Sequence, residues 1–218
     1  MTTTIDPVAT AGLMTREVRD GSRDGVPTKI AVARRTYASD RDDLWNALTS
    51  AERLPRWFLP VSGELTVGGR YQLKGNAGGQ VERCDAPESF DITWEFGGQV
   101  SWVTVSLSPA DDGTTLELMH EAPVDPDFWT QYGPGAVGVG WDLALVGLGL
   151  YLATGSDNDA TEFEEWTLSP VGVEFVRLAS TDWADAAIAA GEDADQSRAA
   201  GERTLAFYTV PPTAEPEA

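Results

Sequence analysis

Residues 39–58 constrain the fold more than any other segment, and they read SDRDDLWNALTSAERLPRWF. Ser39 is suited to cap a helix, and Asp42 takes the third helical position of a capping box. The apolar residues recur with the three-to-four spacing of one buried helical face: Leu44, Trp45, Leu48 and Ala51. A proline then ends the helix. The segment therefore predicts a short amphipathic helix, followed by a turn that presents the aromatic pair Trp57 and Phe58.

A strand over residues 28–37 is predicted before this helix, and a hairpin after it. Gly68 and Gly69 form a two-residue turn between predicted strands at 64–67 and 70–73. Both glycines can adopt the positive φ that such a turn requires. The chain therefore changes from helical to strand periodicity after residue 60.

Three further strands are predicted in the middle of the chain. Residues 90–96 alternate between apolar and polar side chains, as in a strand with one buried face. Gly97 and Gly98 turn the chain into a strand over 99–107. An Asp-Asp-Gly turn then leads into a strand over 114–120. This order predicts an antiparallel meander.

A long helix is predicted to end near residue 153, with its start at about 127 or 135. Large apolar residues follow helical spacing along it: Trp141, Leu145, Leu148 and Leu152. The stretch 135–155 is long enough to span a membrane, but it contains Asp142, which is costly in a bilayer. We therefore expect this helix to lie against the sheet, whose apolar face needs a partner. A curved sheet over a helix favours an internal cavity.

The pattern divides the chain into four parts: a loose arm over 1–27, a main domain over 28–155, a helical extension over 156–212 and a disordered tail over 213–218. Ser169 and Pro170 predict the start of one helix in the extension. Gly191 predicts its end, and a last helix is expected over about 193–208.

Composition bears on partners and location. The chain has a formal net charge of -20, from 35 acidic and 15 basic residues, so it repels nucleic-acid phosphates and anionic membrane surfaces. Cys84 is the only cysteine, which excludes an internal disulfide. The N-terminus lacks the apolar run of a secretion signal. We therefore expect a cytoplasmic protein that binds neither nucleic acid nor membrane.

Metal and nucleotide sites are not expected, and neither is a cofactor. One histidine and one cysteine cannot form a zinc site alone. The acidic residues at 157–162 lack the pattern of a calcium-binding loop. Residues 133–138 match GxGxxG, but no buried strand precedes them, as a dinucleotide site requires.

Aromatic residues are the candidate ligand-binding side chains. Trp94 and Trp141 are the best candidates, because one is predicted on the apolar face of the sheet and the other on the long helix. We expect Trp57 and Phe58 at the mouth of the cavity, and packing alone for Trp45. The remaining candidates of this kind are Tyr71 and Trp102. Arg56 and Arg70 are expected to form ion pairs with the abundant acidic residues rather than to bind a ligand.

His120 is the only histidine, and its parity along the strand places it on the face of Leu116 and Leu118. As a general base it needs a hydrogen-bonded partner, whereas Glu121 points to the opposite face. Two interpretations stay open. His120 either contacts a ligand or takes part in catalysis, or it is a structural histidine near the end of a strand. No GxSxG motif accompanies it.

The order of these motifs resembles the Bet v 1-like, START-related (SRPBCC) superfamily, and within it the branch named for the activator of Hsp90 ATPase. The resemblance covers about 30–152 and rests on these residues: Leu44-Trp45-Asn46-Ala47-Leu48, Leu54, Trp57-Phe58, Val67-Gly68-Gly69-Arg70, Ala86-Pro87, Phe90 to Trp94, Gly113-Thr114-Thr115-Leu116, His120-Glu121 and Gly140-Trp141-Asp142-Leu143-Ala144-Leu145. The last helices are similar to an extension found in bacterial, especially actinobacterial, members. The resemblance implies an α+β helix-grip fold, and it supplies no shared catalytic residues.

We expect the cavity of this helix-grip domain to bind a small hydrophobic or amphipathic molecule. One alternative is an enzyme of the cyclase, aromatase or hydrolase kind, which requires His120 or Asp142 to face the same cavity. The other alternative is a protein-interaction module, including an Hsp90 co-chaperone or a homodimer. The chain lacks the separate N-terminal module with which eukaryotic Hsp90 activators hold the chaperone, which argues against the co-chaperone.

Overall fold

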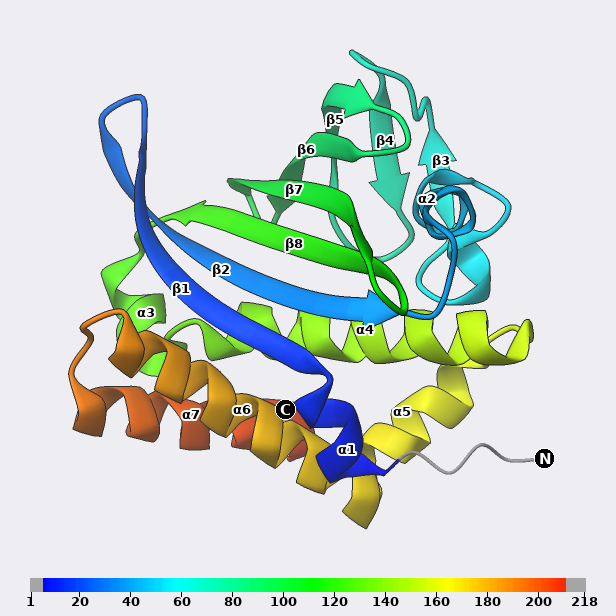
Figure 1. Ribbon diagram of the computed structural model, residues 1–218. Coiled ribbons are helices and arrows are strands. Elements are labelled where there is room, and N and C mark those ends of the chain that lie inside the picture. Colours follow the sequence, from blue (N-terminus) through cyan, green and yellow to red (C-terminus); the bar gives the residue numbers. More distant parts are fainter. Residues whose placement is uncertain (1–5, 211–218) are drawn as a thin grey trace, which may run out of the picture.

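A computed structural model describes residues 6–210 (Figure 1). The strands in this part of the chain are β1 (Met14–Arg23), β2 (Val26–Tyr37), β3 (Val61–Gly63), β4 (Arg70–Leu73), β5 (Gly78–Asp85), β6 (Ser89–Phe96), β7 (Gln99–Ala110) and β8 (Gly113–Pro123). The helices are α1 (Pro7–Gly12), α2 (Arg41–Thr49), the 3-10 turn η1 (Leu54–Arg56), α3 (Pro126–Tyr132), α4 (Gly135–Thr154), α5 (Ala160–Leu168), α6 (Pro170–Ala189) and α7 (Ala194–Thr209).

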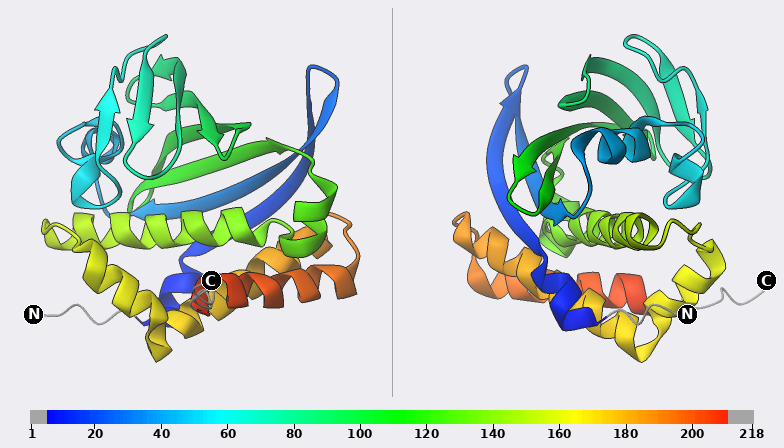
Figure 2. Two further views of the ribbon diagram at one scale, coloured as in Figure 1. Left: turned by 180° about the vertical axis from the view of Figure 1, so that it is seen from behind. Right: turned by 45° about the vertical axis from the view of Figure 1, so that its right-hand side comes forward.

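The strands form one antiparallel sheet in the order β1-β2-β8-β7-β6-β5-β4-β3. Figure 2 shows this sheet curving over α4, with α2 and η1 at one end of the arch. Helices α5, α6 and α7 lie on the other side of α4 (Figures 1 and 2). The architecture is therefore the α+β helix-grip fold that the sequence predicts, with a helical layer added beneath it.

Strands β6 to β8 form the antiparallel meander that the alternating residues and the glycine turns predict. Gly97 and Gly98 have φ of 59° and 80°, and Gly113 has φ of 140°, so each turn uses a conformation that favours glycine. The predicted strand at 64–67 is wrong. These residues form a loop that returns to β5, where the Gly68 N–H donates to the Val81 carbonyl and the Val81 N–H to the Gly69 carbonyl, at 2.8 and 3.0 Å.

The N-terminal segment is more ordered than the loose arm predicted for residues 1–27. Strand β1 pairs with β2 along its whole length, from Met14 opposite Arg35 to Arg23 opposite Val26. The side chains of Met14 and Val18 are buried beneath it. The prediction is therefore wrong for residues 14–27, because this polar strand is held by backbone pairing at the sheet edge.

Helix α2 begins one residue later than a Ser39 cap would place it. Asp40 is the N-cap residue, and its side chain makes no capping hydrogen bond. The Ser39 hydroxyl instead donates to the Asp43 carboxylate at 3.0 Å. Leu44 and Ala47 form the buried face, whereas Ala51 lies beyond the helix and is exposed.

Helix α4 is buried on two sides, which accounts for its apolar composition. It is long and apolar enough to cross a membrane, and it is the core helix here. Its small residues permit close packing: a Cβ on Gly138 would lie 2.2 Å from the Trp183 ring of α6, and one on Gly149 would lie 2.4 Å from the Arg35 guanidinium of β2. Gly155 closes the helix with φ of 67°.

Helix α6 packs on α4 and begins as predicted, whereas the sequence pattern predicts no bounds for α5, which precedes it. The Ser169 hydroxyl accepts from the Gly172 N–H at the start of α6, and Gly191 has φ of 99° just after its end. The side chains of Phe175, Val176 and Trp183 are completely buried. The division of the chain into a main domain and an extension stays a prediction, and the predicted tail at 213–218 lies outside the described residues.

Candidate functional site: an apolar cavity beneath the sheet

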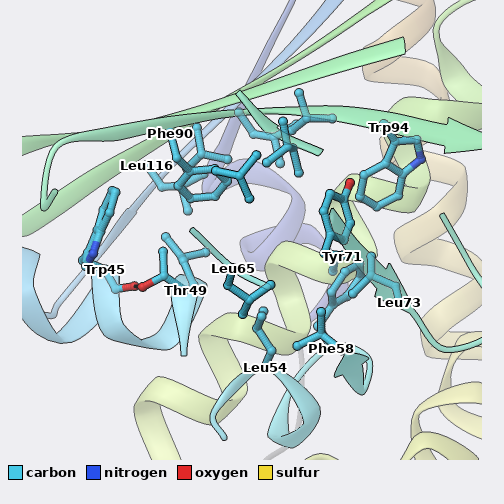
Figure 3. Close-up of a pocket in the computed structure, with 18 of the residues that line it drawn as sticks. Trp45, Thr49, Leu54, Phe58, Leu65, Tyr71, Leu73, Phe90, Trp94 and Leu116 are labelled. Carbon is cyan, nitrogen blue, oxygen red and sulfur yellow. Dashed lines mark hydrogen bonds between the residues drawn. The ribbon is translucent and has the colours of Figure 1, made fainter. Parts of the chain in front are cut away.

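The arch between the sheet and α4 forms a partly open cavity of about 320 Å³. Figure 3 shows side chains from α2, the loops around it and strands β4 and β6 converging on this space. Seven aromatic residues line it: Trp45, Trp57, Phe58, Tyr71, Phe90, Trp94 and Trp141. The other lining residues are mostly Leu, Val and Ile, so the cavity offers an apolar and largely aromatic surface.

No charged side chain lines the cavity among the residues that the structure describes. Several polar groups of the lining side chains already bind protein groups. The Tyr71 hydroxyl donates to the Thr93 carbonyl at 2.7 Å, and the Trp57 indole N–H donates to the Ala47 carbonyl at 2.9 Å. The Thr49 hydroxyl donates to the carbonyl of Trp45 at 2.8 Å. The site is therefore suited to burying apolar surface and not to holding a charge.

Aromatic rings run in a row along one side of the cavity. Trp57 stacks on Phe58 with ring centroids 5.4 Å apart, and Phe58 stacks on Trp141 at 6.3 Å. Trp141 then contacts Trp94 at 5.0 Å with tilted rings. The row joins the η1 region to the long helix and the sheet. The row therefore forms a continuous aromatic wall on this side of the cavity.

Two candidates from the sequence do not line this cavity. Trp102 lies on the opposite face of the sheet, where the Arg23 guanidinium stacks on its ring at 4.1 Å. His120 lies behind Trp94 and Trp141 and lines a second, smaller cavity of about 70 Å³. Trp45, for which packing alone was expected, does line the main cavity and also packs edge-on against Phe90.

His120 is held by hydrogen bonds on both ring nitrogens. The Trp141 indole N–H donates to His120 Nδ1 at 2.9 Å, and His120 Nε2 lies 2.8 Å from the Ser101 hydroxyl. The ring is only 7% exposed, and burial lowers the pKa of His120 to about 4. His120 is therefore neutral at neutral pH and serves as a hydrogen-bonded structural group.

Asp142 faces away from the cavity. It is completely buried on the other side of α4, where its carboxylate accepts from Arg16 of β1 and from the Trp183 indole N–H of α6, both at 2.9 Å. Burial raises the pKa of Asp142 although Arg16 opposes this shift. Neither acid–base residue that an enzyme in this cavity would require lines it.

The remaining polar candidates form surface ion pairs. Arg56 pairs with Asp157 at 2.5 Å and Arg70 with Glu95 at 2.6 Å, as the excess of acidic residues predicts. Among residues 6–210, no group of three or more His, Cys, Asp and Glu side chains is placed to hold a metal ion.

Sequence reasoning missed several lining residues. Leu65 lies in the loop that the sequence assigns to a strand, and Val81 and Cys84 lie in β5, which the sequence does not predict. Charged residues interrupt β5, and its pairing with β6 shifts register between Val81 and Arg83. A strict two-residue period therefore could not identify this strand.

The fold and the cavity are those of a helix-grip domain suited to ligand binding. The chain belongs to the family described as "Activator of Hsp90 ATPase homolog 1-like protein", whose model matches residues 38–153. This finding confirms the resemblance seen in the sequence.

Solved structures support the same assignment. The crystal structure of CalU16 from Micromonospora echinospora is 28% identical, with a TM-score of 0.63, and the match covers 82% of this chain and 99% of CalU16. Its solution structure gives 30% identity, a TM-score of 0.66, and coverage of 82% and 97%. The conserved protein EF2215 from Enterococcus faecalis, 16% identical with a TM-score of 0.57, shares the fold over 85% of this chain and 96% of its own. No curated protein matches the chain.

Proposed function

We propose that this protein binds a neutral, apolar or aromatic small molecule in the main cavity. The observation that carries the proposal is the lining itself, which combines seven aromatic side chains with no charged one. An apolar cavity of about 150 Å³ is large enough for benzene. A cavity of 320 Å³ has about twice that volume and is therefore suited to a molecule of about two to three rings.

Two probes with one skeleton test this proposal. N-phenyl-1-naphthylamine is neutral, whereas 8-anilino-1-naphthalenesulfonate adds a sulfonate to nearly the same ring system. We expect the neutral probe to bind at least tenfold more tightly, because burying an unpaired anion is costly and the protein carries a net charge of -20. Fluorescence titration measures both affinities, and equal binding of the two would contradict the proposal.

Matched tryptophan variants locate the binding site. Trp94→Leu and Trp141→Leu remove ring faces from the cavity and should weaken binding of the neutral probe several-fold. Trp102→Leu changes the same residue type on the opposite face of the sheet, and it should leave binding unchanged. Thermal unfolding of each variant separates lost binding from lost stability. Native mass spectrometry of the purified protein, followed by denaturation, would then identify any molecule carried from the cell.

The geometry supports binding over catalysis, since neither His120 nor Asp142 lines the main cavity. An enzymatic role in this cavity would have to use other lining groups, such as the Tyr71 hydroxyl or the Cys84 thiol. Location in the cytoplasm and the absence of nucleic-acid and membrane partners stay predictions from composition.

A second candidate function is interaction with a second copy of the chain. An aromatic patch on α3 and α7 favours it: Phe128 is 41% exposed and Phe207 58%, with Tyr132 packed between them, and Val210 nearby is 62% exposed. A Phe207→Ser variant should then shift a dimer to monomer in sedimentation velocity. A monomeric wild-type protein at high micromolar concentration would exclude this candidate.

A further inference from the structure

We propose that His120 sets the length of ligand that the main cavity accepts, by holding Trp141 in a wall between this cavity and the second one. This inference rests on the proposed function, because it concerns the selectivity of the same site. His120 acts here as a positioning residue, since it does not line the main cavity.

The two cavities meet at a small aromatic cluster. Trp94 and Trp141 line the main cavity, whereas His120 and Val137 line the second. Val137 precedes Trp141 by one turn of α4, and His120 is paired with Val103 of β7, which lines the main cavity. Among residues 6–210, no residue lines both cavities, so at this cluster two side chains separate them: Trp141, which lines the main cavity, and His120 behind it, which lines the second.

The hydrogen bonds that hold this wall have a fixed direction. An indole N–H can only donate, so Nδ1 of His120 accepts from Trp141 and carries no proton. The neutral ring then carries its proton on Nε2, which donates to the Ser101 hydroxyl. That hydroxyl donates to the Trp94 carbonyl at 3.1 Å. One relay thus connects both tryptophans of the wall.

Ring packing adds to these bonds. His120 contacts Trp94 and Trp141 edge-on, with centroids 6.1 and 5.9 Å apart. Without an acceptor at residue 120, the indole N–H of Trp141 would lose its hydrogen-bond partner, and this loss would make the present position of the ring less stable. Trp141 would then be held in its present orientation by ring packing alone, and a ligand could displace it toward the second cavity.

The second cavity gives the size of the expected change. Its 70 Å³ correspond to about two groups of the size of a water molecule, or about two methylenes. Each buried methylene strengthens binding about fourfold. Opening the wall should therefore extend the accepted chain by about two carbons, and should tighten binding of the longest ligands by about tenfold.

A series of unbranched 1-alkanols, measured by titration calorimetry, tests this inference. For the wild-type protein, affinity should rise with each carbon and then reach a plateau. For Trp141→Ala, which removes the wall directly, the plateau should move to longer alcohols.

Two variants of His120 separate its hydrogen bond from its volume. Leu and Asn have nearly the same shape, but only Asn places an acceptor near the position of Nδ1. His120→Leu should move the plateau to longer alcohols, whereas His120→Asn should restore the wild-type limit. The same plateau in Trp141→Ala as in wild type, or equal shifts in the Leu and Asn variants, would overturn the proposal.

Hydrogen exchange of the Trp141 indole N–H, followed by NMR, gives a readout without ligand. This proton should be protected in the wild-type protein and in His120→Asn, and should exchange at least tenfold faster in His120→Leu. Equal protection in all three proteins would refute the role of His120, whatever the alcohols do. If neither the alcohols nor N-phenyl-1-naphthylamine bind the wild-type protein while the exchange pattern holds, the proposed function fails, whereas the role of His120 in holding Trp141 stands.

Discussion

His120 couples the pH to the stability of the protein. Its pKa is lowered from 6.5 to about 4 by burial, so between these values the unfolded chain binds a proton that the folded protein does not. The free energy of unfolding should therefore fall as the pH decreases from about 6.5 to about 4, and His120 should have no such effect above this range. The loss is on the order of 3 kcal/mol.

Urea unfolding of the wild-type protein and of His120→Asn across this pH range measures the effect. Acidic residues titrate in both proteins, so the difference between the two curves isolates the histidine. The wild-type protein should lose its advantage over the variant as the pH decreases. Parallel curves would show that His120 is not buried in its neutral form.

At the scale of single residues, the sequence identifies the aromatic candidates for the site better than it predicts the direction in which each side chain points. Trp94 lies in a strand that strictly alternates apolar and polar side chains, so its face can be read directly. Trp102 lies next to Val103, and both residues suit an apolar face. Only the pairing of Val103 with His120 and of Trp102 with Glu121 decides which of them points inward. That pairing depends on residues distant in the sequence.

Three elements meet at the buried pair of Arg16 and Asp142. Arg16 of β1 is 3% exposed, and it binds Asp142 of α4 at 2.9 Å and Asp182 of α6 at 2.7 Å. Arg16→Met would leave Asp142 buried without its cation, and it should cost about 3 to 5 kcal/mol of stability. Chemical denaturation measures this loss.

A double-mutant cycle gives the control. Asp142→Leu alone removes the acceptor of both Arg16 and Trp183, and should also destabilise the protein. The double variant Arg16→Met with Asp142→Leu should cost clearly less than the two single changes combined, because no unpaired charge is left buried; Asp182 also loses Arg16, but its side chain is 45% exposed. Additive losses would mean that the two groups do not stabilise each other.

The element scale also shows why β1 could not be recognised from its composition. Its ten residues include charged side chains on both faces, which a half-buried strand seldom has. Its hairpin turn at Asp24 and Gly25, with φ of 52° and 80°, is the one local signal. On the outer face, Glu17 binds Arg34 at 2.9 Å, so charges there stabilise a strand by cross-strand pairing.

For the whole molecule, the main prediction from the sequence was the arch of sheet over helix. It followed from three kinds of local signal, namely glycine-containing turns, one alternating strand and one long apolar helix. The cavity could be expected but not outlined, because its walls come from segments that are joined only by tertiary packing. The helical layer beneath α4 covers a second buried face, which holds Asp142 and the glycine opposite Trp183.

The pairing of β2 with β8 has a consequence for synthesis on the ribosome. The hairpin of β1 and β2 is made first, and its partner strand ends only at Pro123. Until the chain has grown that far, one side of β2 presents unpaired N–H and C=O groups, and such an edge can pair with another chain. The nascent polypeptide therefore passes through a stage at which strand exchange between neighbouring molecules competes with folding.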